Sequence, residues 1–165
     1  MATPLSNLEL IRSTISGVVI AFDSKNFQNL RNFFTEDCLA DYPRSLGQLQ
    51  GVDSVIAGLQ KANGHIGTFH ALTTRAIHLT GGNTAEATTY CSAGHFSVHK
   101  TFFADARYFD KLVKVNDGDH VKWMISSRQT NMVGIPRGDF SILNMNFDIC
   151  LDELKGENAA FTTFG

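Results

Sequence analysis

The hydrophobic pattern of this chain changes its period once, and that change constrains the fold more than any other feature. From Leu8 to Phe22 the apolar residues recur at the three- and four-residue spacing of a helix. Beyond about residue 68, apolar and polar residues alternate as in half-buried strands, and residues 81–83 and 116–119 have hairpin-turn sequences. Helices followed by hairpin-linked strands are typical of the α+β class.

The predicted elements are three helices, a short strand before the third helix, and then four long strands. Ser6 and Glu9 form a capping-box pattern at the start of the first helix, which is expected to end near Phe22. The other two helices are expected at 26–34 and 53–64, with a turn at 36–37, a short strand at 38–42 and a polar loop at 44–51. The long strands are expected at 69–80, 84–99, 106–115 and 121–130.

These elements predict a cone-shaped barrel, in which three N-terminal helices wrap a curved antiparallel sheet around an enclosed pocket. The length of 165 residues fits a single domain. Its core is expected over about residues 5–135. The irregular tail, 136–165, is expected to fold over the pocket as a lid or to form a subunit contact.

Composition excludes several classes of protein. The net charge is −2 and the isoelectric point is near 6.3, which disfavours binding to nucleic acid. No apolar run approaches the roughly 18 residues of a membrane span, and the N-terminus lacks a signal-peptide pattern. The three cysteines are far apart and odd in number, so we expect them to be reduced and the protein to be cytoplasmic. The 13 phenylalanines can fill a core or line an apolar cavity.

Asp23 and His70 are the candidate catalytic residues. Asp23 follows the first helix, and His70 lies on the first long strand. A carboxylate that orients a histidine makes an acid–base site that needs neither metal nor cofactor, and imidazole titrates near neutral pH. The alternative is that Asp23 only caps the helix and His70 bonds a backbone carbonyl.

Strand alternation predicts which other side chains share the inner face of the cone. It places His95, Tyr108 and Asp110 with His70, whereas His78 and His99 are expected nearer the strand ends and in solvent. A β-bulge would reverse such assignments. The three faces are predicted as His70, Leu72, Thr74, Ala76 and His78; Cys91, Ala93, His95, Ser97 and His99; and Tyr108, Asp110 and Leu112.

Four pieces of sequence carry a family resemblance: FFTEDCLADY at 33–42, Gly51, TFHALTTRAIHLTGGNTAEATTYC at 68–91, and RYFDKLVKVNDGDHVKWMISSR at 107–128. In this order they resemble the SnoaL-like branch of the nuclear transport factor 2-like superfamily, over about residues 8–130. The first half is most similar to fungal scytalone dehydratases, because FDSKNFQNLRNFF followed by DY matches their Tyr-Asp-Ser-Lys-Asp-Trp stretch and later Asp-Tyr.

The resemblance implies roles for individual residues. Asp23 would orient the catalytic His70, and Tyr42 would polarise a substrate carbonyl through an ordered water. Either His95 or His99 would be the second histidine. Phe22 stands where the dehydratases have another water-binding tyrosine, and their Ser-x-Asn pair is replaced near residues 106–108. Scytalone itself is therefore not assigned as the substrate.

Such a pair could enolise a small hydrophobic carbonyl compound, polycyclic or polyketide-like, from secondary metabolism. That step is shared by dehydration, double-bond isomerisation and ring closure. Tyr42, Tyr90 and Tyr108 are candidate hydrogen-bond donors to the developing enolate oxygen. No cofactor fingerprint is present, and no metal site is expected, because His95 and His99 would lie about 13 Å apart on a strand.

Two other functions remain open. Asp110 and Arg128 could hydrolyse an epoxide or lactone, as an Asp–Arg–Asp arrangement does in a sister branch, or could form a structural ion pair. The same cone could also be a non-catalytic module for ligand binding or assembly. A homodimer or homotrimer is expected, because the convex face of the sheet needs a cover.

Overall fold

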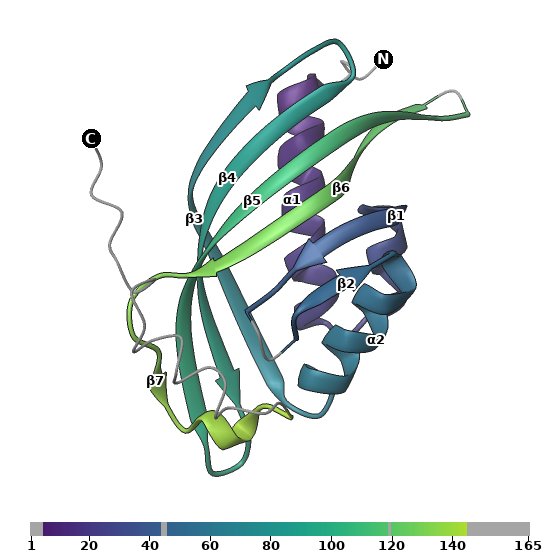
Figure 1. Ribbon diagram of the computed structural model, residues 1–165. Coiled ribbons are helices and arrows are strands. Elements are labelled where there is room, and N and C mark those ends of the chain that lie inside the picture. Colours follow the sequence, from purple (N-terminus) through teal and green to yellow (C-terminus); the bar gives the residue numbers. More distant parts are fainter. Residues whose placement is uncertain (1–4, 44–45, 119, 145–165) are drawn as a thin grey trace.

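The computed structural model describes residues 5–43, 46–118 and 120–144 (Figure 1). Helix α1 (Asn7–Asp23) begins as predicted, because the Ser6 hydroxyl accepts a hydrogen bond of 3.3 Å from the backbone N–H of Glu9. Its apolar stripe is buried and includes Ile11, Ile15 and Phe22. Because Asp23 is the last residue of α1, the helix carries a carboxylate at its C-terminal end.

The second predicted helix is wrong in type and in length. Residues Phe27–Asn32 form a 3₁₀ helix, η1, and strand β1 (Phe34–Asp41) starts two residues later. Phe27 and Leu30 are buried one 3₁₀ turn apart, a spacing that an α-helical reading also accommodates. Phe34 is fully buried as a strand residue, and the predicted turn at 36–37 lies inside β1.

The predicted loop before the third helix contains a strand. Strand β2 (Gln48–Gln50) pairs antiparallel with β1, and helix α2 (Val52–Asn63) follows, close to its predicted range. Gly51 between them has a φ of 80°, and its N–H donates a hydrogen bond of 2.7 Å to the carbonyl of Cys38. This backbone conformation favours glycine, which explains the residue at this junction.

The four long strands form the predicted antiparallel meander. They are β3 (Gly67–Leu79), β4 (Thr84–Phe96), β5 (Thr101–Asp117) and β6 (His120–Met132). β4 ends three residues earlier than predicted and β5 begins five residues earlier. The turn between them is closed by Ser97 and Lys100 and contains neither glycine nor proline, so no residue there signals a turn.

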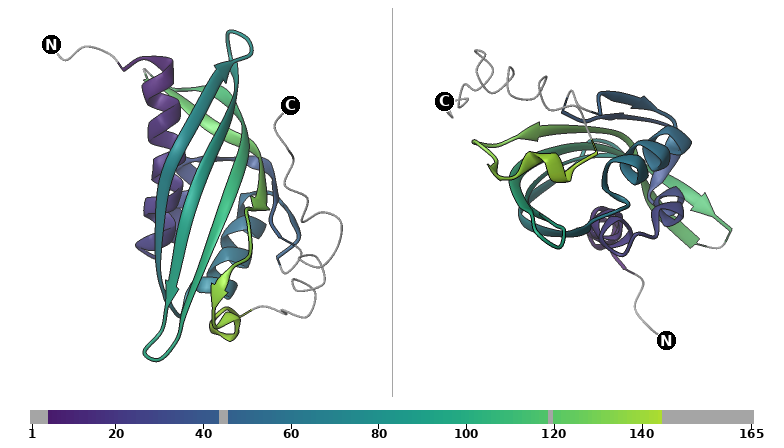
Figure 2. Two further views of the ribbon diagram at one scale, coloured as in Figure 1. Left: turned by 90° about the vertical axis from the view of Figure 1, so that its left-hand side faces the viewer. Right: turned by 90° about the horizontal axis from the view of Figure 1, so that it is seen from below.

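The complete sheet is mixed rather than purely antiparallel. Within the described residues its strand order is β2-β1-β6-β5-β4-β3, and β1 runs parallel to β6. A short strand, β7 (Arg137–Gly138), pairs with β5. The view from below in Figure 2 shows the sheet bent into an arc, with α1 and α2 along its open side. The α+β cone predicted from the sequence is therefore confirmed.

The first part of the predicted tail closes one end of this arc. After β7, the 3₁₀ helix η2 (Phe140–Ile142) lies beside β5 (Figure 2). The ring centres of Phe140 and Phe102 lie 4.7 Å apart. The Nε2 atom of His65 lies 3.0 Å from the carbonyl oxygen of Ile142. The role of the tail as a lid or subunit contact stays a prediction, and residues 145–165, with Cys150, lie outside the described residues.

None of the helices in the described ranges combines the length and the apolar character that a membrane-crossing segment requires.

Candidate active site

A β-bulge in β3 determines which side chains face the inside of the cone. The register of β3 against β4 shifts by one residue between Leu72 and Arg75. Arg75 therefore takes the inner face with Leu72, opposite the buried Thr89 of β4. The predicted inner-face set was right for His70 and Leu72 but wrong beyond the bulge for Thr74 and Ala76. His78 is exposed, as expected.

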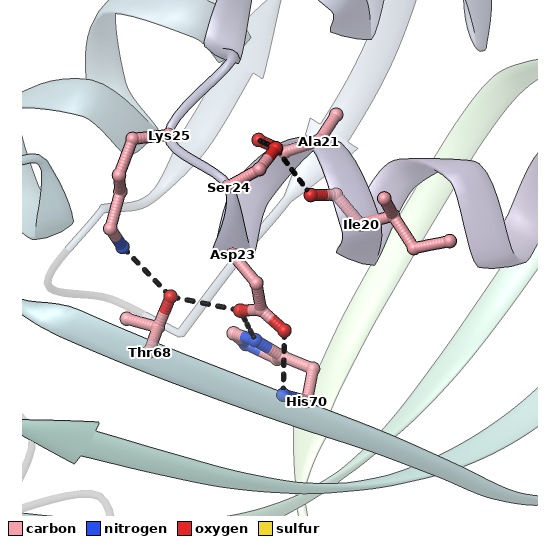
Figure 3. Close-up of polar contacts among 7 residues, drawn as sticks. All are labelled: Ile20, Ala21, Asp23, Ser24, Lys25, Thr68 and His70. Atoms are coloured by element: carbon pink, nitrogen blue, oxygen red, sulfur yellow. Dashed lines mark hydrogen bonds and ion pairs between the residues drawn. The ribbon is translucent and has the colours of Figure 1, made fainter.

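The end of α1 meets β3 in a close carboxylate–imidazole contact (Figure 3). Oδ1 of Asp23 lies 2.7 Å from Nδ1 of His70. The other carboxylate oxygen, Oδ2, accepts a hydrogen bond of 2.9 Å from the backbone N–H of the same histidine. Two hydrogen bonds from one residue fix the relative orientation of the two groups, and they place Nδ1 rather than Nε2 against the carboxylate.

Two residues that the sequence analysis did not select complete this contact. The hydroxyl of Thr68 lies 2.8 Å from Oδ1 of Asp23, and Nζ of Lys25 lies 2.8 Å from the same hydroxyl. Thr68 shares the inner face with His70 by strand alternation, so its position could have been inferred. Lys25 could not, because it has a φ of 61°, a left-handed conformation that costs a lysine about 1 kcal/mol.

The electrostatics of the contact favour an ionised Asp23. Burial acts to raise the pKa of Asp23, but the hydrogen bonds and charge of His70, with further hydrogen bonds from Thr68 and the His70 backbone, outweigh it and leave that pKa lowered. Burial lowers the pKa of Lys25, and the neighbouring Asp23 charge opposes that change.

The structure selects His95 over His99 as the histidine nearest His70. The ring centres of His70 and His95 are 6.0 Å apart, whereas His99 lies in the exposed turn after β4. His95 is 8% exposed, and its Nδ1 is buried with no hydrogen-bond partner in the part of the chain that the structure describes. Burial, assisted by the charge of His70, lowers the pKa of His95 to about 4, so this ring is neutral near pH 7. The ring of Phe22 packs edge-on against His70 at 4.8 Å.

A second polar group lies on β5, β6 and the end of β1. Arg128 donates two hydrogen bonds to Asp110, of 2.7 and 2.8 Å, and both side chains are buried. The Arg128 guanidinium lies 4.6 Å from the centre of the Tyr108 ring. Burial raises the pKa of Tyr42 to about 12, although the nearby Arg128 charge opposes this change. Burial also raises the pKa of Tyr108, so both phenols stay protonated.

Tyr90 is the one predicted site residue that the fold separates from the others. Its neighbour Cys91 faces inward with His95, so Tyr90 points to the outer face of the sheet. There it lies beside Arg107, whose guanidinium is 6.0 Å from the ring centre. Tyr90 therefore cannot reach a ligand on the inner face.

Small side chains separate the histidine pair from the arginine group. Ala93, Cys91 and Ala106 lie between them on β4 and β5 and pack with Tyr108 in a small buried cluster that is distinct from the main core. The buried hydroxyls of Thr89 and Thr130, like Nδ1 of His95, have no hydrogen-bond partner among the described residues. Buried polar atoms usually have hydrogen-bond partners, so unpaired ones beside small side chains suit a polar ligand bound on the inner face.

A hollow among the described residues lies away from the candidate site. It has a volume of about 410 Å³ and is lined by residues from η1, β1, α2, β5 and β6, including Arg31, Glu36 and Met124. No candidate site residue lines it. The candidate site therefore rests on the contacts of Asp23 and His70. In the described part of the chain, no three His, Cys, Asp or Glu side chains are grouped as metal ligands.

Comparisons with known proteins agree with this architecture. Among solved structures, a Novosphingobium aromaticivorans protein provisionally named an aromatic ring hydroxylase is 17% identical, with a TM-score of 0.73 over 86% of this chain and 99% of its own. A second protein of that organism, provisionally named a scytalone dehydratase, is 19% identical, with a TM-score of 0.67 over 79% of this chain and 85% of its own.

A third similar structure is the hexachlorocyclohexane dehydrochlorinase LinA-type3 from Novosphingobium barchaimii. It is 11% identical, with a TM-score of 0.65 over 80% of this chain and 89% of its own. At such identities these likenesses concern the fold. No curated protein matches the chain. The model of the SnoaL-like domain matches residues 4–129, and the chain therefore belongs to the SnoaL-like family of the nuclear transport factor 2-like superfamily.

Proposed function

We propose that this protein is a cofactor-independent lyase or isomerase of the dehydratase or cyclase type. Its substrate would be a small hydrophobic carbonyl compound, polycyclic or polyketide-like. The observation that carries the proposal is the 2.7 Å contact between Oδ1 of Asp23 and Nδ1 of His70. A carboxylate on Nδ1 leaves Nε2 as the nitrogen that exchanges a proton with a substrate.

The chemistry follows from this orientation. Nε2 of His70 takes a proton from the carbon next to the substrate carbonyl, and the electron pair of the broken C–H bond moves to the carbonyl oxygen as an enolate. Asp23 stabilises the imidazolium that results. In a dehydration, the enolate re-forms the carbonyl, a C=C bond forms, and the C–O bond to a β-hydroxyl breaks as His70 gives that hydroxyl the proton, so water leaves. In an isomerisation of an unsaturated carbonyl compound, the proton returns to a different carbon and the double bond moves. Within the described residues, Nε2 of His70 has no hydrogen-bond partner. It is also absent from the buried polar atoms that lack a partner, so this nitrogen is accessible.

The other inner-face residues would bind the substrate. Tyr42 and Tyr108 carry protonated phenols and could donate hydrogen bonds to the enolate oxygen. His95 is neutral near pH 7, so we assign it a hydrogen-bonding role in proton transfer beside His70. Phe22 would provide an apolar wall against the His70 ring.

The family and the names of similar structures support the class of reaction. Two of the similar structures have names that refer to elimination reactions. One is provisionally named a scytalone dehydratase, and the other is a hexachlorocyclohexane dehydrochlorinase. An elimination begins with removal of a proton from carbon, which is the step that the Asp23–His70 pair suits.

The hydrolase alternative is less well supported. Both carboxylate oxygens of Asp110 accept hydrogen bonds from Arg128, and the side chain of Asp110 is completely buried. No part of this carboxylate is open to solvent, which disfavours it as the group that activates a water molecule. The remaining alternative, a ligand-binding module without catalysis, would use the same inner face.

The test is turnover of polycyclic β-hydroxyketones, which have an acidic C–H bond and a leaving hydroxyl, followed in D₂O by NMR. We expect loss of the hydroxyl and deuterium uptake next to the carbonyl. His70→Ala should reduce the rate by about 10²–10⁴-fold, while ligand binding is largely kept. His78→Ala is the matched control, because His78 is exposed on the outer face of the same strand. A His70→Ala variant with the wild-type rate would refute the assignment, and binding without turnover by the wild type would favour the non-catalytic module.

A further inference from the structure

Lys25 occupies a position where the backbone favours a different residue. It is the one non-glycine residue in the described ranges with a positive φ, and it directly follows the C-cap of α1. Helices commonly end with glycine in this left-handed conformation, because glycine has no Cβ to clash. Strained backbone of this kind is found at functional sites, where the side chain has a role that compensates for the strain.

The side chain of Lys25 turns back toward the contact between Asp23 and His70 (Figure 3). Its ammonium group lies 2.8 Å from the Thr68 hydroxyl and over the rings of Phe22 and Phe27, at 5.1 and 5.9 Å from their centres. The two rings form an apolar cradle that limits where the ammonium can lie. A surface lysine would extend freely into water, whereas this one is half-buried.

The hydrogen bonds in this chain of groups can run in one direction only. An ammonium group can donate but not accept, so the Thr68 oxygen must accept from Lys25. Thr68 has a single hydroxyl proton, and its other close contact is Oδ1 of Asp23. Thr68 therefore donates to Asp23, and Oδ1 receives one hydrogen bond from Thr68 and another from Nδ1 of His70.

We propose that Lys25 is a positioning residue for the Asp23–His70 pair, acting through Thr68. Its ammonium fixes the direction of the Thr68 hydroxyl, which holds the carboxylate in place, and its charge favours the ionised carboxylate. This inference rests on the proposed function for its catalytic meaning. The arrangement of the four side chains and its effect on the His70 ring can be measured without any substrate.

The charge of Lys25 also acts on the Asp23 carboxylate, since the neighbouring Asp23 charge opposes the lowering of the pKa of Lys25 by burial. The other titratable groups beside the pair are His95 and, less directly, Cys91, both from β4. His95 is neutral near pH 7, so it supplies no positive charge there. Loss of the positive charge at Lys25 should therefore leave the Asp23 carboxylate held less firmly against Nδ1 of His70.

The experiment is ¹⁵N-histidine NMR of the full, unliganded chain at pH 7, which reports how fast the Nδ1–H proton of His70 exchanges with water. In Lys25→Gly and Lys25→Gln, we expect this proton to exchange several times faster than in the wild type, because the carboxylate that holds it is less well fixed. Glycine suits the left-handed backbone, so the melting temperature of Lys25→Gly should not fall. Lys111→Gln is the charge control, because Lys111 is exposed on the outer face of β5.

A third variant separates the hydrogen bond from the charge. Thr68→Val keeps the ammonium but removes the hydroxyl that links it to Asp23. The Nδ1–H proton of His70 should exchange with water several times faster in Thr68→Val than in the wild type. Wild-type exchange rates in both Lys25 variants, or in Thr68→Val, would overturn the proposal. The rate of His70→Ala on substrate judges the proposed function separately, so the two failures can be distinguished.

Discussion

At the scale of single residues, two histidines on neighbouring strands differ in their surroundings and therefore suit different chemical roles. His70 and His95 have ring centres 6.0 Å apart, yet the carboxylate of Asp23 contacts only His70. His95 is buried without a charged partner, and burial lowers its pKa to about 4. In the proposed reaction, His70 would therefore carry the proton while His95 stays neutral.

The buried neutral His95 should make the stability of the protein depend on pH. Its pKa of about 4 in the folded state lies below the ordinary value of about 6.5, so the unfolded chain binds the proton first. The stabilisation is complete above pH 6.5 and is lost as the pH falls toward 4, by about 3 kcal/mol. Asp23, whose pKa is lowered, contributes a loss only at still lower pH.

Urea unfolding between pH 7 and pH 4 measures this effect. We expect His95→Gln to flatten the dependence in that window, because glutamine does not titrate. His99→Gln serves as the control, since His99 is exposed in the turn after β4. An unchanged slope in His95→Gln would show that another group causes the loss.

The residues of the site differ in how far the sequence could reveal them. Asp23 and His70 were predictable, because a helix boundary and a strand alternation place them and the family resemblance pairs them. The choice between His95 and His99 depended on where β4 ends, and that turn has no glycine or proline. Lys25 was not predictable, because its side chain turns inward only through a left-handed backbone that favours glycine.

At the scale of elements, the ion pair of Asp110 and Arg128 joins β5 to β6 in the interior. The two residues are register partners, and both side chains are buried. Removing one partner leaves the other charge buried and uncompensated, which costs about 3–5 kcal/mol. We therefore expect Asp110→Asn to lower the free energy of unfolding by about that amount.

A double variant that removes both charges tests the pair. The variant that combines Asp110→Leu with Arg128→Met should lose less stability than Asp110→Asn alone, because it buries no lone charge. The control is Asp105→Asn, which breaks the exposed contact of 3.7 Å with Arg137 and should change stability by less than about 0.5 kcal/mol. Equal losses in Asp110→Asn and Asp105→Asn would contradict the expectation.

Predicted element boundaries were wrong where one spacing of apolar residues fits more than one kind of secondary structure. The stretch that begins at Phe27 has apolar residues at a spacing that fits an α-helix, a 3₁₀ helix and the start of a strand, and only burial of Phe34 by the core separates them. The bulge in β3 was equally unpredictable from the sequence, because residues 73–75 contain no glycine to indicate it. One inserted residue nevertheless reverses the face of every side chain beyond it.

At the scale of the whole molecule, the order of helices and hairpins was enough to predict the cone. The parallel pairing of β1 with β6 was not predictable, because it joins segments far apart in sequence with no local turn to signal it. The predicted need to cover the convex face of the sheet concerns this same scale. Phe69, Phe96 and Phe103 point outward there, with exposed fractions of 59%, 38% and 40%.

These three phenylalanines form a continuous apolar patch on the outer face. Phe69 and Phe103 flank Gly94 as its register partners on β3 and β5, and the rings of Phe96 and Phe103 are 5.7 Å apart. A Cβ on Gly94 would lie 2.6 Å from the Phe96 ring, so glycine is what lets that ring lie flat on the sheet. Clustered exposed aromatics of this kind favour association between copies of a chain.

We expect the protein to be a homodimer or homotrimer that associates through this patch. Phe69→Lys and Phe103→Lys should each shift it toward the monomer, because a buried unpaired ammonium opposes association. Analytical ultracentrifugation at micromolar concentration measures the change, and Ile20→Lys is the control, since Ile20 is 64% exposed on α1. A wild-type monomer, or an unchanged oligomer in both variants, would rule this interface out. Asp23 and His70 face the opposite side of the sheet, so dissociation by these changes should leave their contact intact.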